Sequence, residues 1–146
     1  MPKQPLKALV LLFLCGSLVE DSVIAVLAWA APDLWFQLFH HADPVDLDVA
    51  LLRRAAGQWG AFAVVQAIAL WRWKHQPLWL IAVAGARISD LLTDISYIVA
   101  VPSLTSLGWT LLLPPPFLNA AFIVVTALAY RQMTAVPQAP ATPSPG

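Results

Sequence analysis

Long apolar segments alternate with short polar segments along the chain. Each apolar segment is long enough to cross a bilayer core of about 30 Å as a helix, at about 1.5 Å per residue. This pattern predicts an all-α polytopic membrane protein whose transmembrane domain, residues 8–131, is a bundle of four helices. The predicted spans are residues 8–31, 51–73, 78–101 and 107–130.

The ends of the chain differ from the apolar segments. Residues 1–7 form a short basic leader with Lys3 and Lys7, and residues 132–146 form a Pro/Ala-rich tail that is predicted to be disordered. The leader and the first apolar segment could together form a signal peptide. Because apolar sequence continues beyond Asp21 and completes a full span, we expect a retained transmembrane helix.

The composition supports a membrane protein and narrows its chemistry. Hydrophobic residues make up 60% of the chain and charged residues only 11%, against about 25% charged residues in ordinary soluble domains. The 8 basic and 8 acidic residues balance, so no nucleic-acid partner is indicated. The single cysteine, Cys15, excludes an intramolecular disulfide and a Cys-x-x-Cys redox or metal motif. We expect no metal and no cofactor.

Basic residues gather on one side of the predicted spans. By the positive-inside rule this side is cytoplasmic, so we expect a multi-pass protein of the inner (cytoplasmic) membrane with both termini in the cytoplasm. Arg53 and Arg54, near the outer end of the second span, are exceptions to this trend. The residues on the cytoplasmic side are Lys3, Lys7, Arg72, Lys74 and Arg131.

Residues 32–48 connect the first two predicted spans and are acidic. Two neighbouring histidines, His40 and His41, lie near three aspartates here, which is one pattern of a metal site. Adjacent residues of a helix point about 100° apart, however, and no pair four residues apart completes a ligand set. We therefore prefer a hydrated surface loop, with Asp43 as the N-cap and Pro44 as the first residue of the next helix.

The third predicted span carries charged residues where the bilayer core is expected. Four polar residues follow one another at spacings of three, four and three, which places them on one helix face: Arg87, Asp90, Asp94 and Tyr97. An ionisable residue at mid-membrane costs at least about 2.5 kcal/mol, so these groups need polar partners or water. The opposite face is aliphatic and suits contact with lipid: Ile81, Ile88, Leu92, Ile95 and Val99.

Polar residues of the other spans fall at similar predicted depths. They are Glu20 and Asp21 in the first span, Gln58 in the second and Asn119 in the fourth. Arg54 precedes Gln58 by four residues and shares its face. This agreement in depth predicts a polar cavity shared by the helices. The alternative is a purely structural pairing in which Arg87 binds Glu20 or Asp94.

Three consecutive prolines, Pro114–Pro116, interrupt the fourth predicted span. A helix that began at Pro114 would be too short to cross the bilayer, so the span is predicted to include residues 108–113 and to bend or break at the prolines. The positive end of the second segment would then point into the polar cavity and could hold an anionic group. A kink without function is the alternative.

Two short motifs carry a resemblance to known proteins. Leu51-Leu-Arg-Arg54-x-x-Gly57-x-Trp59 opens the second span, and Gly85-x-Arg87-x-Ser-Asp90 lies in the third. In these motifs and in its four-span layout the chain resembles the DoxX-like and related uncharacterised small four-helix bacterial membrane proteins. It departs from them in Glu20-Asp21 and in the triple proline. Such families are linked variously to redox, lipid and stress roles, so the resemblance implies a fold but no single activity.

Two function classes fit these residues. In the first, the bundle binds a lipophilic small molecule, or isomerises or cyclises it without a cofactor, with a buried carboxyl group as the acid. The candidate acids are Asp94, Glu20 and Asp90, and the candidate ligand-contacting residues are Arg87, Asp21, Arg54, Gln58, Tyr97 and Asn119. The second is a proton-coupled small-molecule exporter that acts as a dimer, with Glu20 as the exchanged carboxylate and the small-residue face of Gly57 and Gly60 for pairing. A structural or accessory membrane subunit is a further alternative.

Overall fold

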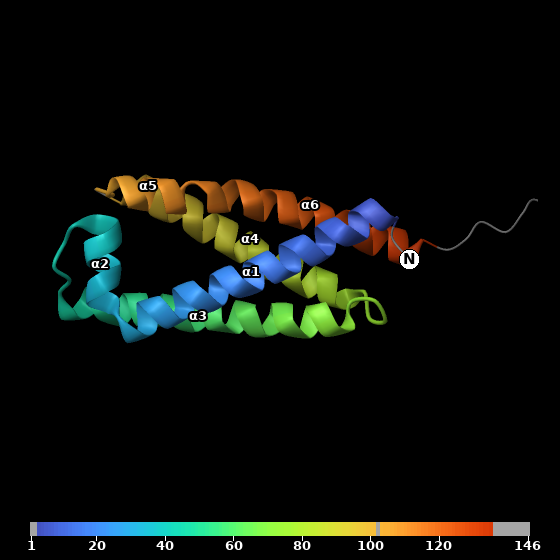
Figure 1. Ribbon diagram of the computed structural model, residues 1–146, viewed down its shortest axis with the longest axis horizontal. Helices are drawn as coiled ribbons and strands as arrows, with labels where there is room; N and C mark the ends of the chain where they lie inside the picture. The colour runs from blue at the N-terminus through green and yellow to red at the C-terminus, as the bar shows by residue number, and fades with distance from the viewer. Residues whose placement is uncertain (1–2, 102, 136–146) are drawn as a thin grey trace, which may run out of the picture.

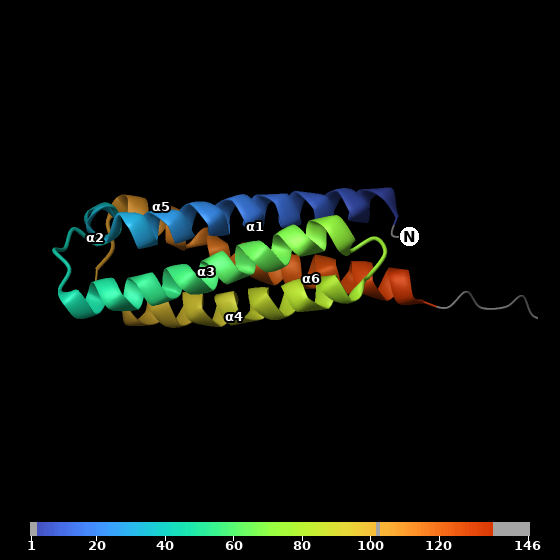
Figure 2. The same cartoon turned by 90° about the horizontal axis from the view of Figure 1, so that it is seen from below.

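The computed structural model describes residues 3–101 and 103–135, and these residues form helices joined by short connections, with no strand among them. The helices are α1 (Gln4–Ala30), α2 (Pro32–His40), α3 (Asp46–Arg72), α4 (Leu78–Ala100), α5 (Ser106–Leu112) and α6 (Pro114–Thr134). The predicted all-α class is confirmed. The long helices α1, α3 and α4, and α5 continued by α6, run side by side along the longest axis (Figures 1 and 2).

The long helices close into a ring of neighbours. α1 packs mainly against α3 and α4 mainly against α6, while further contacts join α3 to α4 and α1 to α6. The backbone N–H of Lys3 donates a hydrogen bond of 3.2 Å to the side-chain oxygen of Gln132, so both ends of the described chain lie at one end of the bundle. The short helices α2 and α5 contact each other at the opposite end (Figure 1).

Two apolar cores fill the bundle, one toward each end. The core near the chain ends includes Val10, Leu14, Ala69, Trp73, Leu80 and Phe122. The core near α2 consists of Ala28, Trp35, Phe39, Leu52 and Ala56. On α1 the buried Asp21 lies between the residues of the two cores, and on α3 the buried Gln66 does so. A buried polar layer therefore separates the two apolar cores.

α1 and α6 are longer than the predicted spans. α1 begins at Gln4 with a proline in its first turn, where the missing proline N–H sacrifices no helical hydrogen bond, so part of the predicted leader is helical. α6 extends to Thr134, into the segment predicted to be a disordered tail. Residues 1–2 of the predicted leader and 136–146 of the predicted tail lie outside the described residues.

The predicted surface loop between the first two spans contains the helix α2, so that prediction is wrong. Pro32 occupies the first turn, and Trp35 and Phe39, four residues apart, are buried in the second core. The helix ends at His40, and the next residue, His41, has a φ of 50°, the left-handed conformation common after helix ends. The helix is stabilised by the burial of this aromatic face against the rest of the bundle. The segment itself is short and contains several polar residues, so its periodicity alone did not indicate a helix.

α3 begins at Asp46, which corrects the predicted helix start at Pro44, and it includes five residues before the predicted second span. The backbone N–H of Val45 donates a hydrogen bond of 3.1 Å to the carboxylate of Asp48, three residues later. This bond satisfies a donor that precedes the first turn, which is the part an acidic residue at this position plays in a capping box. Asp43 makes no cap here, because two residues separate it from the helix.

α5 is attached to α2 through its N-cap, Thr105. The Thr105 hydroxyl accepts a hydrogen bond of 2.8 Å from the backbone N–H of Gly108 and donates one of 2.7 Å to the carbonyl of Leu38. The backbone N–H of Thr105 donates to the carbonyl of Phe39 at 2.9 Å. Gly108 lies so close to α2 that a Cβ atom added there would meet the Phe39 carbonyl oxygen at 2.7 Å. A residue without a side chain is therefore needed where α5 crosses α2.

The predicted break at the prolines is confirmed. α5 ends at Leu112 and α6 begins at Pro114, with Leu113 between them. Because three successive prolines lack N–H groups, the carbonyl groups of residues 110–112 lose their usual helical donors. The chain keeps its direction across the break, and α5 and α6 together extend along the bundle (Figure 1).

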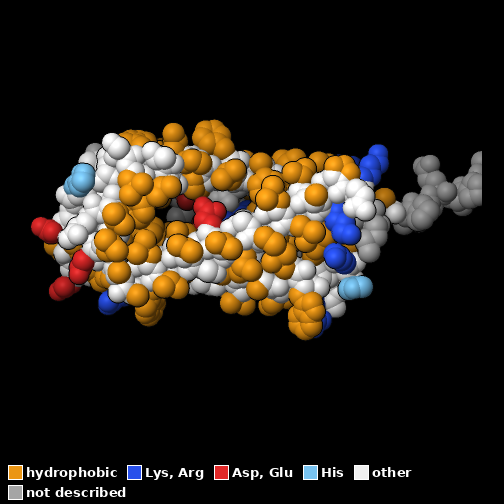
Figure 3. Space-filling view, in the orientation of Figure 1, with side chains coloured by type: hydrophobic (Ala, Val, Ile, Leu, Met, Phe, Trp, Pro, Cys, Tyr) orange, Lys and Arg blue, Asp and Glu red, His pale blue; other side chains and the backbone are white. Residues whose placement is uncertain are grey.

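The surface composition suggests membrane association. Within the described residues, α1 and the combined segment Ser106–Thr134 are long and apolar enough to cross a membrane. The aliphatic face predicted for α4 is exposed, with Ile81, Ile88, Leu92, Ile95 and Val99 all on the surface. Figure 3 shows hydrophobic side chains over most of the visible face and several Lys and Arg side chains at the end near the termini. Asp and Glu side chains appear at the other end, together with a basic side chain, and in a hollow near the middle.

Candidate functional site

A cluster of hydrogen-bonded polar side chains lies between the two apolar cores, with Arg87 at its centre. The Arg87 side chain is 2% exposed. Its Nη1 atom donates hydrogen bonds of 3.1 Å to Asp90 Oδ2 and 3.2 Å to Asn119 Oδ1. Its Nη2 atom forms an ion pair with Asp21 Oδ2. One guanidinium group thus joins α4 to α1 and to α6.

The residue of α1 that binds Arg87 is Asp21, which corrects the predicted structural pairing with Glu20 or Asp94. The residues of α1 that face the bundle repeat at helical spacing and are Val10, Leu14, Ser17, Asp21 and Ala28. Asp21 lies on this interior face, whereas Glu20 points about 100° away and is half-buried. Among the described residues Glu20 has no side-chain hydrogen bond, although it lies within electrostatic range of Arg87.

α3 contributes Gln66 to the cluster, a residue that sequence reasoning did not assign to the site. Gln66 Nε2 donates a hydrogen bond of 2.6 Å to Asp21 Oδ2. The predicted contributor, Gln58, is exposed and donates to Ser89 Oγ at 3.3 Å, outside the cluster. The interior face of α3 includes Leu52, Ala56, Ala63, Gln66 and Ala69. That spacing is the signal in the sequence that would have selected Gln66.

Asn119 connects the cluster to Asp94. Its Nδ2 atom donates hydrogen bonds of 3.1 Å to Asp90 Oδ2 and 3.0 Å to Asp94 Oδ2. Asp90 is 6% exposed and belongs to the buried layer, whereas Asp94 is half-buried one turn further along α4. The predicted helix-face stripe therefore divides into an interior pair, Arg87 and Asp90, and a residue at the margin of the layer.

The cluster contains more acid than base. Arg87 is its only basic side chain among the described residues, and its hydrogen-bond network contains the carboxyl groups of Asp21, Asp90 and Asp94. Arg87 also makes the only two salt bridges found among the described residues. Excess negative charge in a buried layer is unfavourable unless a proton or a positively charged group compensates it.

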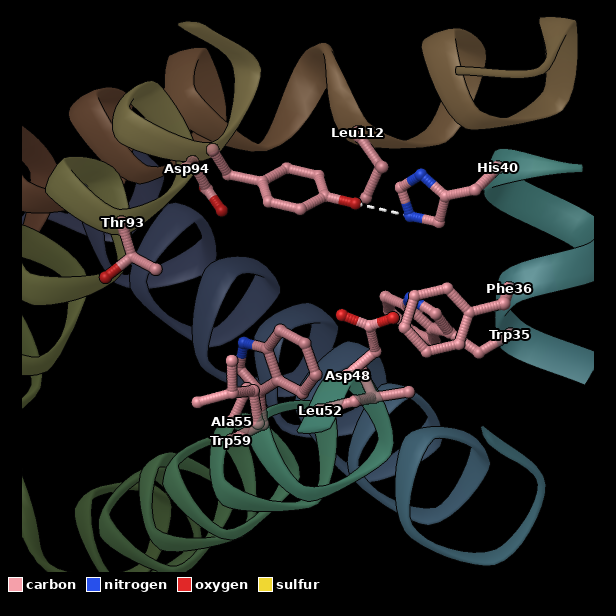
Figure 4. A pocket seen from close by; sticks show the side chains of 12 residues that line it. Trp35, Phe36, His40, Asp48, Leu52, Ala55, Trp59, Thr93, Asp94 and Leu112 are labelled. Atoms are coloured by element: carbon pink, nitrogen blue, oxygen red, sulfur yellow. Dashed lines mark hydrogen bonds between the residues drawn. The ribbon is translucent and has the colours of Figure 1, made fainter. Parts of the chain in front are cut away.

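A cavity of about 360 Å³ adjoins the polar layer at the end of the bundle that carries α2. Its walls are mostly apolar and come from α2, α3, α4 and the end of α5, and Trp35, Phe36, Trp59 and Tyr97 give it an aromatic character. Asp94 and Asp48 also line it, and Figure 4 shows them on α4 and α3, on different sides of the space. Asp94 is thus both a wall residue of the cavity and the last member of the buried cluster.

His40 closes the cavity on the side of α2. Its Nε2 atom lies 2.5 Å from the hydroxyl oxygen of Tyr97, a contact marked by the dashed line in Figure 4. Its Nδ1 atom lies 3.3 Å from the carbonyl oxygen of Ser103. A proton on Nδ1 lets His40 donate to that carbonyl and leaves Nε2 to accept from the Tyr97 hydroxyl. Sequence reasoning placed His40 in a hydrated loop, because the helix that positions it, α2, was not predicted.

Of the remaining predicted site residues, Arg54 and Gln58 lie apart from this arrangement. Arg54 is exposed and neither lines the cavity nor joins the cluster, and the same holds for Gln58. Tyr97, predicted to contact a ligand, is part of the cavity wall. Among the described residues there is no group of three His, Cys, Asp or Glu side chains that could hold a metal ion.

Comparison of the chain with protein-family models, curated proteins and solved structures gives no match. The resemblance to the DoxX-like proteins therefore stays a prediction.

Proposed function

We propose that the protein is a four-span integral membrane protein that binds a lipophilic small molecule in the aromatic cavity. The observation that carries the proposal is the position of Asp94, which lines a mostly apolar cavity and accepts a hydrogen bond from Asn119 behind the wall. Small-molecule sites are typically concave and apolar, with volumes of about 300–1,000 Å³ and few polar groups. The cavity of about 360 Å³ has this character.

The proposed spans are α1, α3, α4 and α5 with α6, and both termini are cytoplasmic. The inward orientation of Arg87 and Asp90 supports this, because it leaves an aliphatic outer face on α4 that can meet lipid. The concentration of Lys and Arg side chains at the end near the termini supports the orientation. The cavity would then open in the outer half of an inner (cytoplasmic) membrane.

The residues of the site have distinct roles in this proposal. Asp94 contacts the ligand, while Asn119 holds the Asp94 carboxyl group in place and is itself held by Arg87. Asp21 and Asp90 fix Arg87 from two helices. A positioned carboxyl group can also transfer a proton to a bound molecule, which is the step that a cofactor-independent isomerisation or cyclisation requires.

A proton-coupled exporter is the second candidate, and the excess of carboxyl groups over Arg87 favours it. Glu20 would then exchange the proton, because it is half-buried and has no hydrogen-bond partner among the described residues. A transport assay in proteoliposomes separates the two. Uptake or release driven by a proton gradient would support export, and binding without transport would support the first proposal.

A cavity-filling variant tests the binding proposal. Ala55 is half-buried on α3 and lines the cavity, whereas Ala61 is exposed on the same helix, so Ala55→Trp and Ala61→Trp form a matched pair. We expect mass spectrometry of organic extracts from the purified proteins to find a lipophilic compound with the wild type and with Ala61→Trp, and to find it lost with Ala55→Trp. The same extract from all three proteins would contradict the proposal.

A further inference from the structure

We propose that the ligand of the aromatic cavity is a lipophilic organic cation, a protonated amine or quaternary ammonium group attached to a hydrophobic body. This inference rests on the proposed binding function and narrows its ligand class. Three features of the cavity carry it: the aromatic faces, the charges of the wall, and the pairing of the charged groups behind the wall.

The aromatic faces suit a cation. Trp35 of α2 and Trp59 of α3 lie side by side in the wall, with ring centroids 5.5 Å apart and ring planes inclined by 31°. Phe36 and Tyr97 complete the aromatic lining from α2 and α4. The negative face of an aromatic ring attracts a cation within about 6 Å of its centroid, and tryptophan does so most strongly. Several such faces around one cavity are the arrangement by which ammonium groups are recognised.

The wall is acidic as well as aromatic. Asp94 and Asp48 lie on different walls, and no lysine or arginine is among the described residues that line the cavity (Figure 4). The one histidine of the wall, His40, has both ring nitrogens within hydrogen-bond distance of other groups, Tyr97 and the Ser103 carbonyl. A negatively charged ligand would meet two carboxyl groups and no compensating base.

The groups behind the wall leave Asp94 without a basic partner. The guanidinium group of Arg87 binds Asp21, Asp90 and Asn119, and it makes no salt bridge to Asp94 within the described part of the chain. From the described residues, Asp94 receives one side-chain hydrogen bond, which is the amide hydrogen bond from Asn119. A cation in the cavity would supply the missing positive charge next to a half-buried carboxylate. A neutral ligand of the same shape would gain only the apolar contact.

Three probes of nearly equal size separate these possibilities. The cation is phenylbutyl-trimethylammonium, the neutral analogue replaces its ammonium nitrogen with carbon, and the anion is phenylbutyl-sulfonate. The full-length protein in zwitterionic lipid nanodiscs is titrated with each probe, and the saturable change of tryptophan fluorescence is recorded, because Trp35 and Trp59 line the cavity. Titration of Ala55→Trp gives the contribution from partition into lipid.

We expect the cation to bind at least about fivefold more tightly than the neutral analogue, and the anion to bind most weakly. Asp94→Asn should reduce this preference for the cation and leave the affinity for the neutral analogue unchanged. Asp48→Asn should also reduce this preference, and it provides the test if Asp94→Asn is poorly folded. Asp33→Asn, an exposed position of α2 outside the wall, is the control and should bind as the wild type does.

The outcomes separate this inference from the binding proposal. Equal or tighter saturable binding of the neutral analogue or the anion would overturn the cation inference and leave the binding proposal standing. A preference for the cation that survives both Asp94→Asn and Asp48→Asn would also overturn it. Absence of saturable binding for all three probes would contradict the inference, while the wild-type organic extract would still decide on the binding proposal separately.

Discussion

Arg87 on α4 and Asp21 on α1 form an ion pair in the middle of the bundle, although 66 positions separate them in the sequence. The two helices are not neighbours in the ring of long helices, so the pair spans its diagonal. Both side chains are buried, with 2% and 1% exposure. When one partner of such a pair is removed, the other remains as an uncompensated buried charge. The relative position of α1 and α4 therefore depends on both residues.

Replacement of Arg87 should be far more damaging than replacement of an arginine at the surface. Arg87→Leu leaves Asp21 and Asp90 without their cation and should cost about 3 kcal/mol or more. Arg53 is exposed and makes no salt bridge among the described residues, so Arg53→Leu should change the stability little. Thermal melting of the detergent-solubilised variants tests this. An equal fall in melting temperature for both variants would show that the buried ion pair does not stabilise the bundle more than a surface arginine does.

The neighbouring acids of α1 should respond differently to neutralisation. Asp21→Asn weakens the charge-assisted hydrogen bond to Arg87 and should cost about 2 kcal/mol. Glu20→Gln removes no side-chain hydrogen bond among the described residues, so its melting temperature should stay near that of the wild type. A larger loss for Glu20→Gln would mean that the helix face assigned to α1 is wrong. If the protein is an exporter, Glu20→Gln should instead abolish proton-coupled transport while the fold is retained.

Two glycine-to-alanine variants test the contact between α2 and α5. The Cβ atom of Gly108→Ala would lie 2.7 Å from the backbone carbonyl oxygen of Phe39, so α5 must move and the protein should lose about 1–3 kcal/mol. Gly57→Ala meets nothing within 4 Å and should be neutral or stabilising by about 0.5–1 kcal/mol, because alanine favours the helix. A destabilised Gly57→Ala would indicate that this face is packed against another protein, which would support a homo-dimer.

Topology can be measured by site-specific labelling in cells. In a Cys15→Ser background, a cysteine at Asp43 should react with a membrane-impermeant maleimide added from outside. A cysteine at Arg131 should react only after the cells are opened, because the proposed topology places it in the cytoplasm. A reporter fused after Tyr130 should likewise report a cytoplasmic location. A reporter inserted within residues 36–43 should report a location outside the membrane. Reaction of the Arg131→Cys variant in intact cells would contradict the four-span topology.

The sequence was sufficient for features that depend on spacing within one helix. Spacings of three and four residues predicted that Arg87 and Asp90 share a face of α4, and both are buried. The same spacing predicted the aliphatic outer face of α4. The missing N–H groups of the prolines predicted the break before Pro114. Each of these follows from local helix geometry and from the chemistry of single residues.

Features that depend on packing between helices could not be predicted in the same way. Depth alone does not decide whether Glu20 or Asp21 faces the interior, because the two residues lie at nearly the same height. Depth also favoured Gln58 over Gln66, which lies about two turns away, although the packing of α3 buries Gln66. The aromatic cavity depends on α2, and the contacts that hold α2 reach across the chain to Thr105. Local pattern contains no information on such a contact.

The division of roles between Asp90 and Asp94 gives the last prediction. Asp90 accepts hydrogen bonds of 3.1 Å from both Arg87 and Asn119 and lies in the buried layer. Asp94 accepts one of 3.0 Å from Asn119 and faces the cavity. We therefore expect Asp90→Asn to destabilise the bundle by about 2 kcal/mol, because it removes a charge that pairs with a buried guanidinium. Asp94→Asn should cost clearly less than Asp90→Asn, because asparagine keeps an oxygen that accepts from Asn119 and Arg87 makes no salt bridge to Asp94 among the described residues.

Function should follow the opposite order. Asp94→Asn keeps an oxygen that can accept from Asn119, so the fold is retained, but it removes the charge that faces the ligand. Binding of the cationic probe, and any activity toward a bound lipophile, should therefore be lost in Asp94→Asn, while Asp94→Glu should restore part of it. Asp90→Asn should bind the probe almost as the wild type does at a temperature where it is folded. If both variants lose stability equally and Asp94→Asn still binds the probe, the acids serve only to hold the helices together, and Asp94 has no role in binding.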